Sequence, residues 1–135
     1  MSGTLFDKVW DEHVVTAREG GDALLYIDRH MIHDLHFRIF GDLTARGLSL
    51  SEPRKLFALP DHSVPTTARV LEDIPEGEMR EAVQVLEQSA NDLGFNHFSI
   101  SDDRHGIVHV VGPEQGITLP GLTLVCGDSH TSTHG

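Results

Sequence analysis

The sequence predicts an α/β fold in which helices flank a largely parallel sheet. Amphipathic helical patterns alternate with short apolar runs of strand-forming residues along the 135 residues, and this alternation is typical of βαβ units. Several of these runs end directly in aspartate and histidine, and the carboxyl ends of parallel strands are where such sheets bind ligands. A chain of this length can bury one core, so we expect residues 1–135 to belong to one domain.

Three segments carry a helical period. The first is expected at residues 5–14, where Thr4 is a suitable N-cap and apolar residues recur every three or four positions. The second is expected between residues 30 and 47. The third and strongest covers residues 75–93 and ends before Gly94, which is typical of a helix C-terminus.

Short apolar runs bounded by glycine, proline or charged residues predict the strands. They are rich in valine, isoleucine, leucine and phenylalanine, which favour extended backbone. The expected strands are residues 23–27, 55–59, 98–100, 107–111 and 122–126.

Composition narrows the class of protein. A net charge of −11 with scattered Lys and Arg residues argues against a nucleic-acid surface, which needs a basic stripe. The chain shows no apolar run of the ~20 residues that a membrane span requires and no secretory signal pattern, so we expect a cytoplasmic protein. The single cysteine agrees with a reducing compartment. Ten histidines are the unusual feature, and they favour an enzyme over a structural protein.

The candidate active-site residues follow two of the predicted strands. Asp61 and His62 follow the run at 55–59, and Asp128, Ser129 and His130 follow the last run. An aspartate beside a histidine can orient the imidazole and favour its charged form, while a serine hydroxyl can hydrogen-bond a substrate oxygen. These groups suit proton transfer. The alternative is a pair of polar turns whose side chains only cap backbone amides.

Other histidines lie close to these motifs in the predicted topology. His109 lies within an apolar run, where its ring must find a partner, and it is either a satisfied core histidine or a partner of the nearby aspartates. His30, His33 and His36 recur every three residues, whereas zinc ligands on one helix usually lie four apart. We therefore predict no metal site here. His30 also follows the run at 23–27, directly after Asp28 and Arg29.

Four segments carry a family resemblance. LLYIDRHMIHD, LFALPDHSVPT, GIVHVVGPEQGITLPG and VCGDSHTSTHG, in this order, resemble the amino-terminal part of the large subunits of 3-isopropylmalate dehydratases, a family of the aconitase superfamily. The resemblance implies an incomplete aconitase-like α/β catalytic domain. It also implies an iron–sulfur hydro-lyase of leucine biosynthesis, which isomerises 2-isopropylmalate and 3-isopropylmalate by dehydration and rehydration.

The resemblance assigns roles by motif. It implies catalytic roles for Asp61, His62, His109, Asp128 and His130, and substrate-binding roles for Ser129, His33, Asp28, Arg29 and His30. The chain departs from the family after His33, where it reads HDLHFRIFGDL in place of HEVTSPQAF, so no role is carried over to residues 35–40.

A cofactor and a partner follow from the same resemblance. It implies a [4Fe–4S] cluster with ligands beyond residue 135, because Cys126 alone cannot supply the several thiolates that such a cluster needs. It implies a small-subunit partner that supplies the base for the substrate carbon, and a small dicarboxylate as substrate. This fragment alone is expected to be inactive.

Three alternatives stay open from the sequence. Homoaconitate and dimethylmalate are substrates of similar chemistry. A mononuclear metal hydrolase could use Asp61, His62, Asp128 and His130 as ligands. The chain could also be a folding and interaction segment without an activity of its own.

Overall fold

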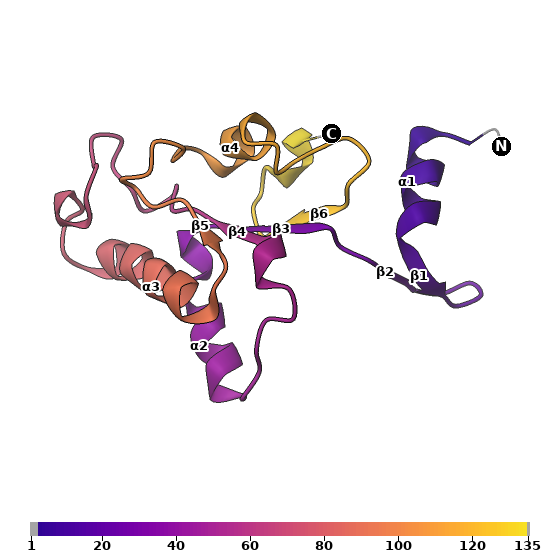
Figure 1. Ribbon diagram of the computed structural model, residues 1–135, viewed down its shortest axis with the longest axis horizontal. Coiled ribbons are helices and arrows are strands. Elements are labelled where there is room, and N and C mark those ends of the chain that lie inside the picture. The colour runs from indigo at the N-terminus through magenta and orange to yellow at the C-terminus, as the bar shows by residue number, and fades with distance from the viewer. Residues whose placement is uncertain (1–2, 135) are drawn as a thin grey trace.

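A four-stranded parallel sheet forms the centre of the computed structural model, which describes residues 3–134 (Figure 1). Its order is β5-β4-β3-β6, with all three neighbouring pairs parallel. The strands are β3 (Arg29–Ile32), β4 (Leu56–Ala58), β5 (Asn96–His97) and β6 (Leu124–Cys126). The predicted α/β fold with a parallel sheet is therefore confirmed.

Helices cover both faces of this sheet (Figure 1). On one face lie α2 (Arg38–Ala45) and α3 (Glu78–Leu93), and on the other lie α4 (Val108–Glu114) and the short 3₁₀ helix η4 (Thr131–His134). Successive strand residues point to opposite faces, so the sheet separates two apolar clusters. Ile32 packs with Phe40 and Leu86 in one cluster, and Met31 packs with Val108 and Val111 in the other.

Helix α3 agrees best with its prediction. Its buried residues Ala82, Val83, Leu86 and Ala90 repeat at helical spacing. Gly94 ends the helix with φ of +74°, a left-handed conformation that favours glycine, and its backbone N–H donates to Ala90 O.

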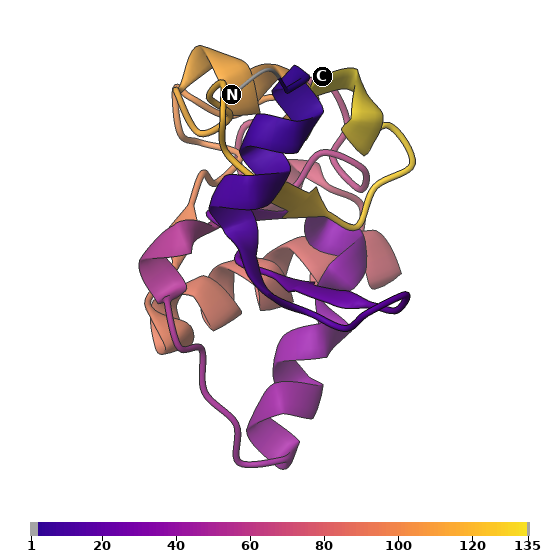
Figure 2. The same ribbon diagram turned by 90° about the vertical axis from the view of Figure 1, so that its right-hand side faces the viewer.

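The N-terminal segment forms a separate layer beside the sheet (Figures 1 and 2). Helix α1 (Leu5–His13) leads into an antiparallel hairpin of β1 (Val14–Ala17) and β2 (Ala23–Leu25). A strand does form within the predicted range 23–27, but its predicted position in the parallel sheet is wrong. It is a partly exposed hairpin strand that does not belong to the central sheet. Two apolar runs separated by a short Gly-containing turn pair locally before they can reach distant strands.

Three further predictions of secondary structure are wrong. The strand expected at 98–100 lies earlier in the chain, as β5 at Asn96–His97. The expected strand at 107–111 is the start of α4, whose inward residues Val108 and Val111 are spaced by three positions. Periodicity cannot separate a short buried helix from a buried strand in so short a run. The expected helix at 30–47 begins as β3, passes through the 3₁₀ helix η1 (Asp34–His36) and becomes helical again only in α2.

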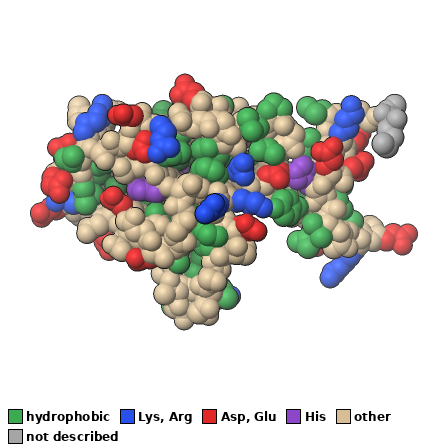
Figure 3. Space-filling model, in the orientation of Figure 1, with side chains coloured by type: hydrophobic (Ala, Val, Ile, Leu, Met, Phe, Trp, Pro, Cys, Tyr) green, Lys and Arg blue, Asp and Glu red, His purple; other side chains and the backbone are tan. Residues whose placement is uncertain are grey.

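The surface of the protein is acidic. Acidic side chains lie at both ends of the face shown in Figure 3, in agreement with the net charge of −11. No helix within residues 3–134 has the length and apolarity needed to cross a membrane.

Candidate active site

The carboxyl ends of β3, β4 and β6 meet at one edge of the sheet. His33 follows β3, Asp61 and His62 follow β4, and Asp128 follows β6. Parallel neighbours end on the same side, which is why segments far apart in the sequence come together here. Helix α4 adds His109 from above the sheet.

Three hydrogen bonds and one ion-pair contact, between His62 and Asp128, join these side chains into a row of carboxylates and imidazoles. Asp61 Oδ1 lies 2.6 Å from His62 Nδ1, and His62 Nε2 lies 3.2 Å from Asp128 Oδ2. Asp128 Oδ1 lies 2.5 Å from His109 Nε2, and His109 Nδ1 lies 2.8 Å from His134 Nε2. We call these five residues the carboxylate–imidazole network. It joins both predicted strand-end motifs and His109 within hydrogen-bonding distance.

Asp128 is the centre of the network and is ionised. Its side chain is 6% exposed, and it also accepts a hydrogen bond from the backbone N–H of His130 at 2.7 Å. The hydrogen bond from His109, followed by that from the His130 N–H, holds the pKa of Asp128 well below its usual range despite burial. A carboxylate in this state can only accept hydrogen bonds, so each imidazole nitrogen facing it carries a proton.

Asp61 links the network to helix α4. Its Oδ2 accepts a hydrogen bond from the backbone N–H of Val108 at 2.8 Å, at the first turn of the helix. The unpaired N–H groups at a helix start favour a negative charge. Asp61 therefore holds His62 with one oxygen and fixes α4 with the other.

Asp34 positions the loop that carries Asp61 and His62. Its side chain is fully buried, and its Oδ1 accepts from the backbone N–H groups of Asp61 at 2.8 Å and His62 at 3.0 Å. Its Oδ2 accepts from the N–H of Ser63 at 2.8 Å. Burial opposes ionisation, but the hydrogen bonds from Ser63, His62 and Asp61 outweigh it and lower the pKa of Asp34.

The sequence motifs predict no role for Asp34, although a detectable signal is present. It follows the apolar pair Met31-Ile32 with only His33 between, which is the same strand-end pattern as in the other two motifs. The pattern is easily missed, because the apolar run at 23–27 also suits a buried strand and Asp34 lies too far beyond it to mark its end.

His33 forms the floor of the site. It is 2% exposed, its ring stacks on that of His62 at 4.1 Å between centroids, and the edge of His36 meets it at 4.3 Å. Burial, followed by the charges of His62 and His36, lowers the pKa of His33, so the ring is neutral at neutral pH. Its Nε2 lies 3.4 Å from the carbonyl oxygen of Gly127, which accepts from it.

Gly127 permits this packing. A Cβ atom at residue 127 would lie 2.6 Å from Nε2 of His36, closer than side chains approach one another. The glycine that ends the last apolar run therefore has a steric role in the site.

Ser129 and His130 lie at the rim. The His130 side chain is 80% exposed, its Nδ1 lies 2.8 Å from Ser129 Oγ, and the same nitrogen is 3.9 Å from Asp128 Oδ1. Both side chains are thus beside the network without being enclosed by it, and they are free to meet a substrate.

Asp28, Arg29 and His30 lie at the other end of β3. The prediction that they follow a strand of the sheet is wrong, because Arg29 and His30 begin β3 and Asp28 precedes it. Asp28 pairs with His13 at 2.7 Å and accepts from the backbone N–H of Thr123 at 2.8 Å. These contacts attach the N-terminal segment to the sheet, and the structure does not bring the three residues to the network.

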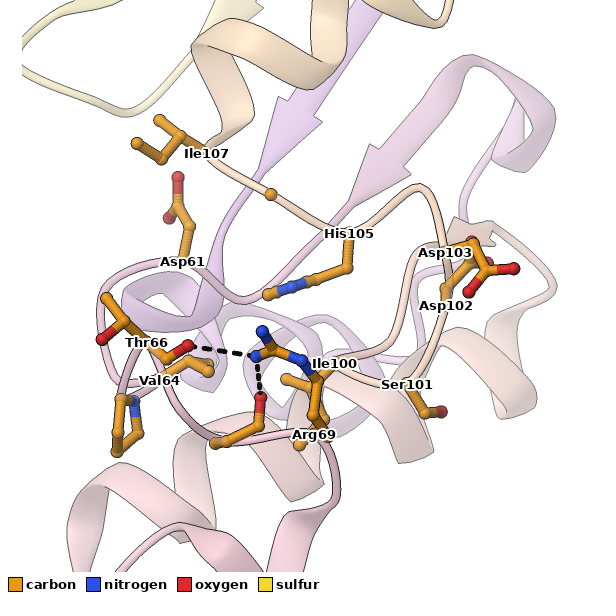
Figure 4. A pocket seen from close by; sticks show the side chains of 13 residues that line it. Asp61, Val64, Thr66, Arg69, Ile100, Ser101, Asp102, Asp103, His105 and Ile107 are labelled. Atoms are coloured by element: carbon orange, nitrogen blue, oxygen red, sulfur yellow. Dashed lines mark hydrogen bonds between the residues drawn. The ribbon is translucent and has the colours of Figure 1, made fainter.

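A cavity of about 480 Å³ opens beside Asp61 (Figure 4). His105 lies in its wall, with Nε2 2.6 Å from the carbonyl oxygen of Pro60. Arg69 closes another side and donates from its guanidinium to the carbonyl oxygens of Thr66 and Ala68, as Figure 4 shows. The cavity offers room for a small polar molecule next to the network.

The histidines and aspartates around Asp61 are already engaged with one another and with backbone N–H groups, so they do not form a ready-made metal site. Donor atoms of His33, Asp34, Asp61 and His62 lie within 4.8 Å of one another. Both oxygens of each carboxylate already accept hydrogen bonds, so a cation here would compete with these donors for the carboxylates. The alternative ligand set of a metal hydrolase is likewise occupied: Asp61 hydrogen-bonds His62, His62 pairs with Asp128, and the His130 side chain is exposed outside this row.

An iron–sulfur cluster does not fit the thiols of this chain. Cys126 is the one cysteine, and burial raises the pKa of its thiol, which disfavours the thiolate that binds iron. We derive no step of the chemistry through a cluster.

Comparison with known families agrees with this geometry. A sequence model of the aconitase family (aconitate hydratase) matches residues 7–135. The chain therefore belongs to the aconitase family, which implies hydro-lyase chemistry and an iron–sulfur cofactor for its members.

Proposed function

We propose that this member of the aconitase family contributes the acid–base half of an active site that isomerises 2-isopropylmalate and 3-isopropylmalate by dehydration and rehydration. The observation that carries the proposal is the carboxylate–imidazole network, in which an ionised Asp128 holds one imidazole on each oxygen. The four sequence segments described above support isopropylmalate as the substrate within the family.

Dehydration places specific demands on such a site. A hydroxyl group leaves well only when it is protonated, and a base must remove the proton from the adjacent carbon. His62 is the donor we assign to the hydroxyl, because it is 34% exposed while Asp61 fixes its ring from Nδ1. Its Nε2 lies 3.2 Å from Asp128 Oδ2, and this ion-pair contact favours the protonated ring.

The rim residues suit the substrate itself. His130 is exposed beside Asp128, so it can deliver a second proton or hold a carboxylate of the substrate. Ser129 can hydrogen-bond the same carboxylate. His33 contributes packing under His62 in its neutral form.

The remaining parts of the reaction are assigned to other residues. A small-subunit partner would supply the base that removes the proton from the carbon. We place this assembly in the cytoplasm.

The test uses the complete enzyme that contains this chain, loaded with its cofactor and partner. Dehydration gives an alkene conjugated to a carboxylate, which is followed by ultraviolet absorbance with 3-isopropylmalate, homocitrate, dimethylmalate and citrate as substrates. We expect the highest kcat/KM with 3-isopropylmalate and a loss of about 100-fold or more in His62→Asn. His97→Asn on the edge strand β5 is the matched control. Preference for another of these acids would overturn the substrate, and full activity of His62→Asn would overturn the role of the network.

A further inference from the structure

His134 is the outermost member of the carboxylate–imidazole network, and the proposed reaction leaves it without a task. Its Nε2 lies 2.8 Å from Nδ1 of His109, and the two rings meet edge to face at 5.0 Å between centroids. His109 is thus held at both nitrogens, by Asp128 on one side and His134 on the other.

The position of each proton follows from Asp128. Because that carboxylate only accepts, His109 carries a proton on Nε2, and the Nδ1 of a neutral ring is then an acceptor. His134 meets this acceptor with its own Nε2, which therefore carries the proton. Burial lowers the pKa of His134, so this ring is neutral at neutral pH.

The fold provides a defined place for the His134 ring. Helix η4 is fixed by the hydroxyl of Thr131, which donates to the carbonyl oxygens of Asp128 at 2.9 Å and Cys126 at 3.2 Å. The ring packs against Gly112 of α4, where a Cβ atom would lie 3.1 Å from Cε1 of His134. The absence of a side chain at residue 112 makes room for the imidazole.

We propose that His134 is a positioning residue that donates to Nδ1 of His109 and thereby keeps the proton of His109 on Nε2, facing Asp128. The inference rests on the proposed function for its consequence in catalysis, but its geometry stands independently. A His109 ring without this partner can turn or move its proton to Nδ1. Asp128 Oδ1 then loses the His109 donor and keeps only the backbone N–H of His130.

That loss would act on His62 through Asp128. A carboxylate with fewer donors is a stronger base. It would stabilise the protonated His62 ring across their ion-pair contact more strongly, and His62 would become a poorer proton donor to the leaving hydroxyl. His134 thus keeps Asp128 a weak base without touching it or the substrate.

The test is a measurement of histidine protonation by nuclear magnetic resonance. Long-range ¹H–¹⁵N correlations of the ¹⁵N-histidine-labelled protein report which nitrogen of His109 carries the proton. We expect a proton on Nε2 in the wild type, a mixture of both forms in His134→Ala, and recovery in His134→Gln, whose amide can donate to the same nitrogen. His97→Gln is the control, because its ring is outside the network.

The outcomes separate the inference from the proposed function. The positioning role is overturned if wild-type His109 carries no proton on Nε2, or if His134→Ala leaves the protonation of His109 unchanged. The wild-type measurement decides the first point even if a variant fails to fold. In the complete enzyme, kcat should fall about tenfold in His134→Ala with KM unchanged and recover in His134→Gln. If the spectra agree but isopropylmalate is not converted, the positioning role stands and the proposed substrate fails.

Discussion

Replacing Asp34 with asparagine tests whether a buried carboxylate holds the loop that presents Asp61 and His62. Asparagine has the same shape but only one side-chain oxygen. The bonds from the two N–H groups at Oδ1 would persist without their charge, while the N–H of Ser63 would face an amide that also donates. The substitution therefore removes one charge-assisted hydrogen bond and leaves one buried donor without an acceptor.

The expected magnitude follows from these contacts. Losing a hydrogen bond to a charged group and leaving a buried N–H unsatisfied costs about 2–4 kcal/mol. This is a large part of the roughly 5–15 kcal/mol that stabilises a domain. Asp34→Ala should cost more, because three N–H groups would lose their acceptor in a fully buried site.

Urea denaturation measures the free energy of unfolding, and hydrogen exchange reports on the loop. We expect a lower midpoint at unchanged slope, together with lost protection of the amides of residues 61–63. Asp42→Asn is the matched control, since this aspartate is exposed on α2 and should change stability by less than about 0.5 kcal/mol. If Asp34→Asn unfolds like the wild type and keeps its protection, the carboxylate does not hold the loop.

Three further predictions follow from single contacts. The contact between His13 and Asp28 should attach the N-terminal segment only over a window of pH. The hydrogen bond to the Val9 carbonyl, together with a smaller effect of Asp28, raises the pKa of His13 against the effect of burial. The contribution of the contact is therefore lost as pH rises through the folded pKa of His13, which lies above 6.5. Burial raises the pKa of Asp28, but hydrogen bonds from Thr123 and His13 outweigh it and lower this pKa below 3.8. The contribution of the contact to stability is therefore also lost as pH falls through the folded pKa of Asp28. Hydrogen exchange of the α1 amides measures both limits. Gly127→Ala should destabilise the chain by about 1–3 kcal/mol in thermal unfolding, because the new Cβ would displace the His36 ring; an unchanged melting temperature would contradict this. His130→Ala should lower turnover of the complete enzyme by about 100-fold. The melting temperature should stay constant, because the His130 side chain is 80% exposed. A loss of stability with unchanged turnover would instead assign His130 a capping role.

The convergence of Asp61, His62 and Asp128 could be predicted from the sequence because it depends on strand direction alone. Parallel strands end at one edge, so two motifs that each follow an apolar run must lie close together if their strands are neighbours or nearly so. In the structure β3 lies between β4 and β6, which leaves His33 under the two motifs.

The parts that could not be predicted depend on choices between equally apolar segments. Residues 23–27 and 29–32 both suit a buried strand, and only the local pairing of the first with β1 gives the central position to the second. The same ambiguity put His109 on a strand, although it reaches Asp128 from a helix. His134 carried no signal, since its partner is defined by the packing of η4 on α4.

The network also bears on how any substitution in this site must be interpreted. Asp34 is fully buried, and the side chains of Asp61 and Asp128 are only 5% and 6% exposed. Each of these carboxylates is satisfied by donors from a different part of the chain. A buried charge that loses its donors costs several kcal/mol, so the same groups that position the imidazoles also hold the ends of β3, β4 and β6 and the start of α4 together. Removing an aspartate will therefore lower stability and turnover at once, whereas removing the exposed His130 separates the two. Turnover of a variant at an imidazole therefore reports on the chemical step. Turnover of a variant at a carboxylate must first be corrected for the fraction of molecules that remain folded.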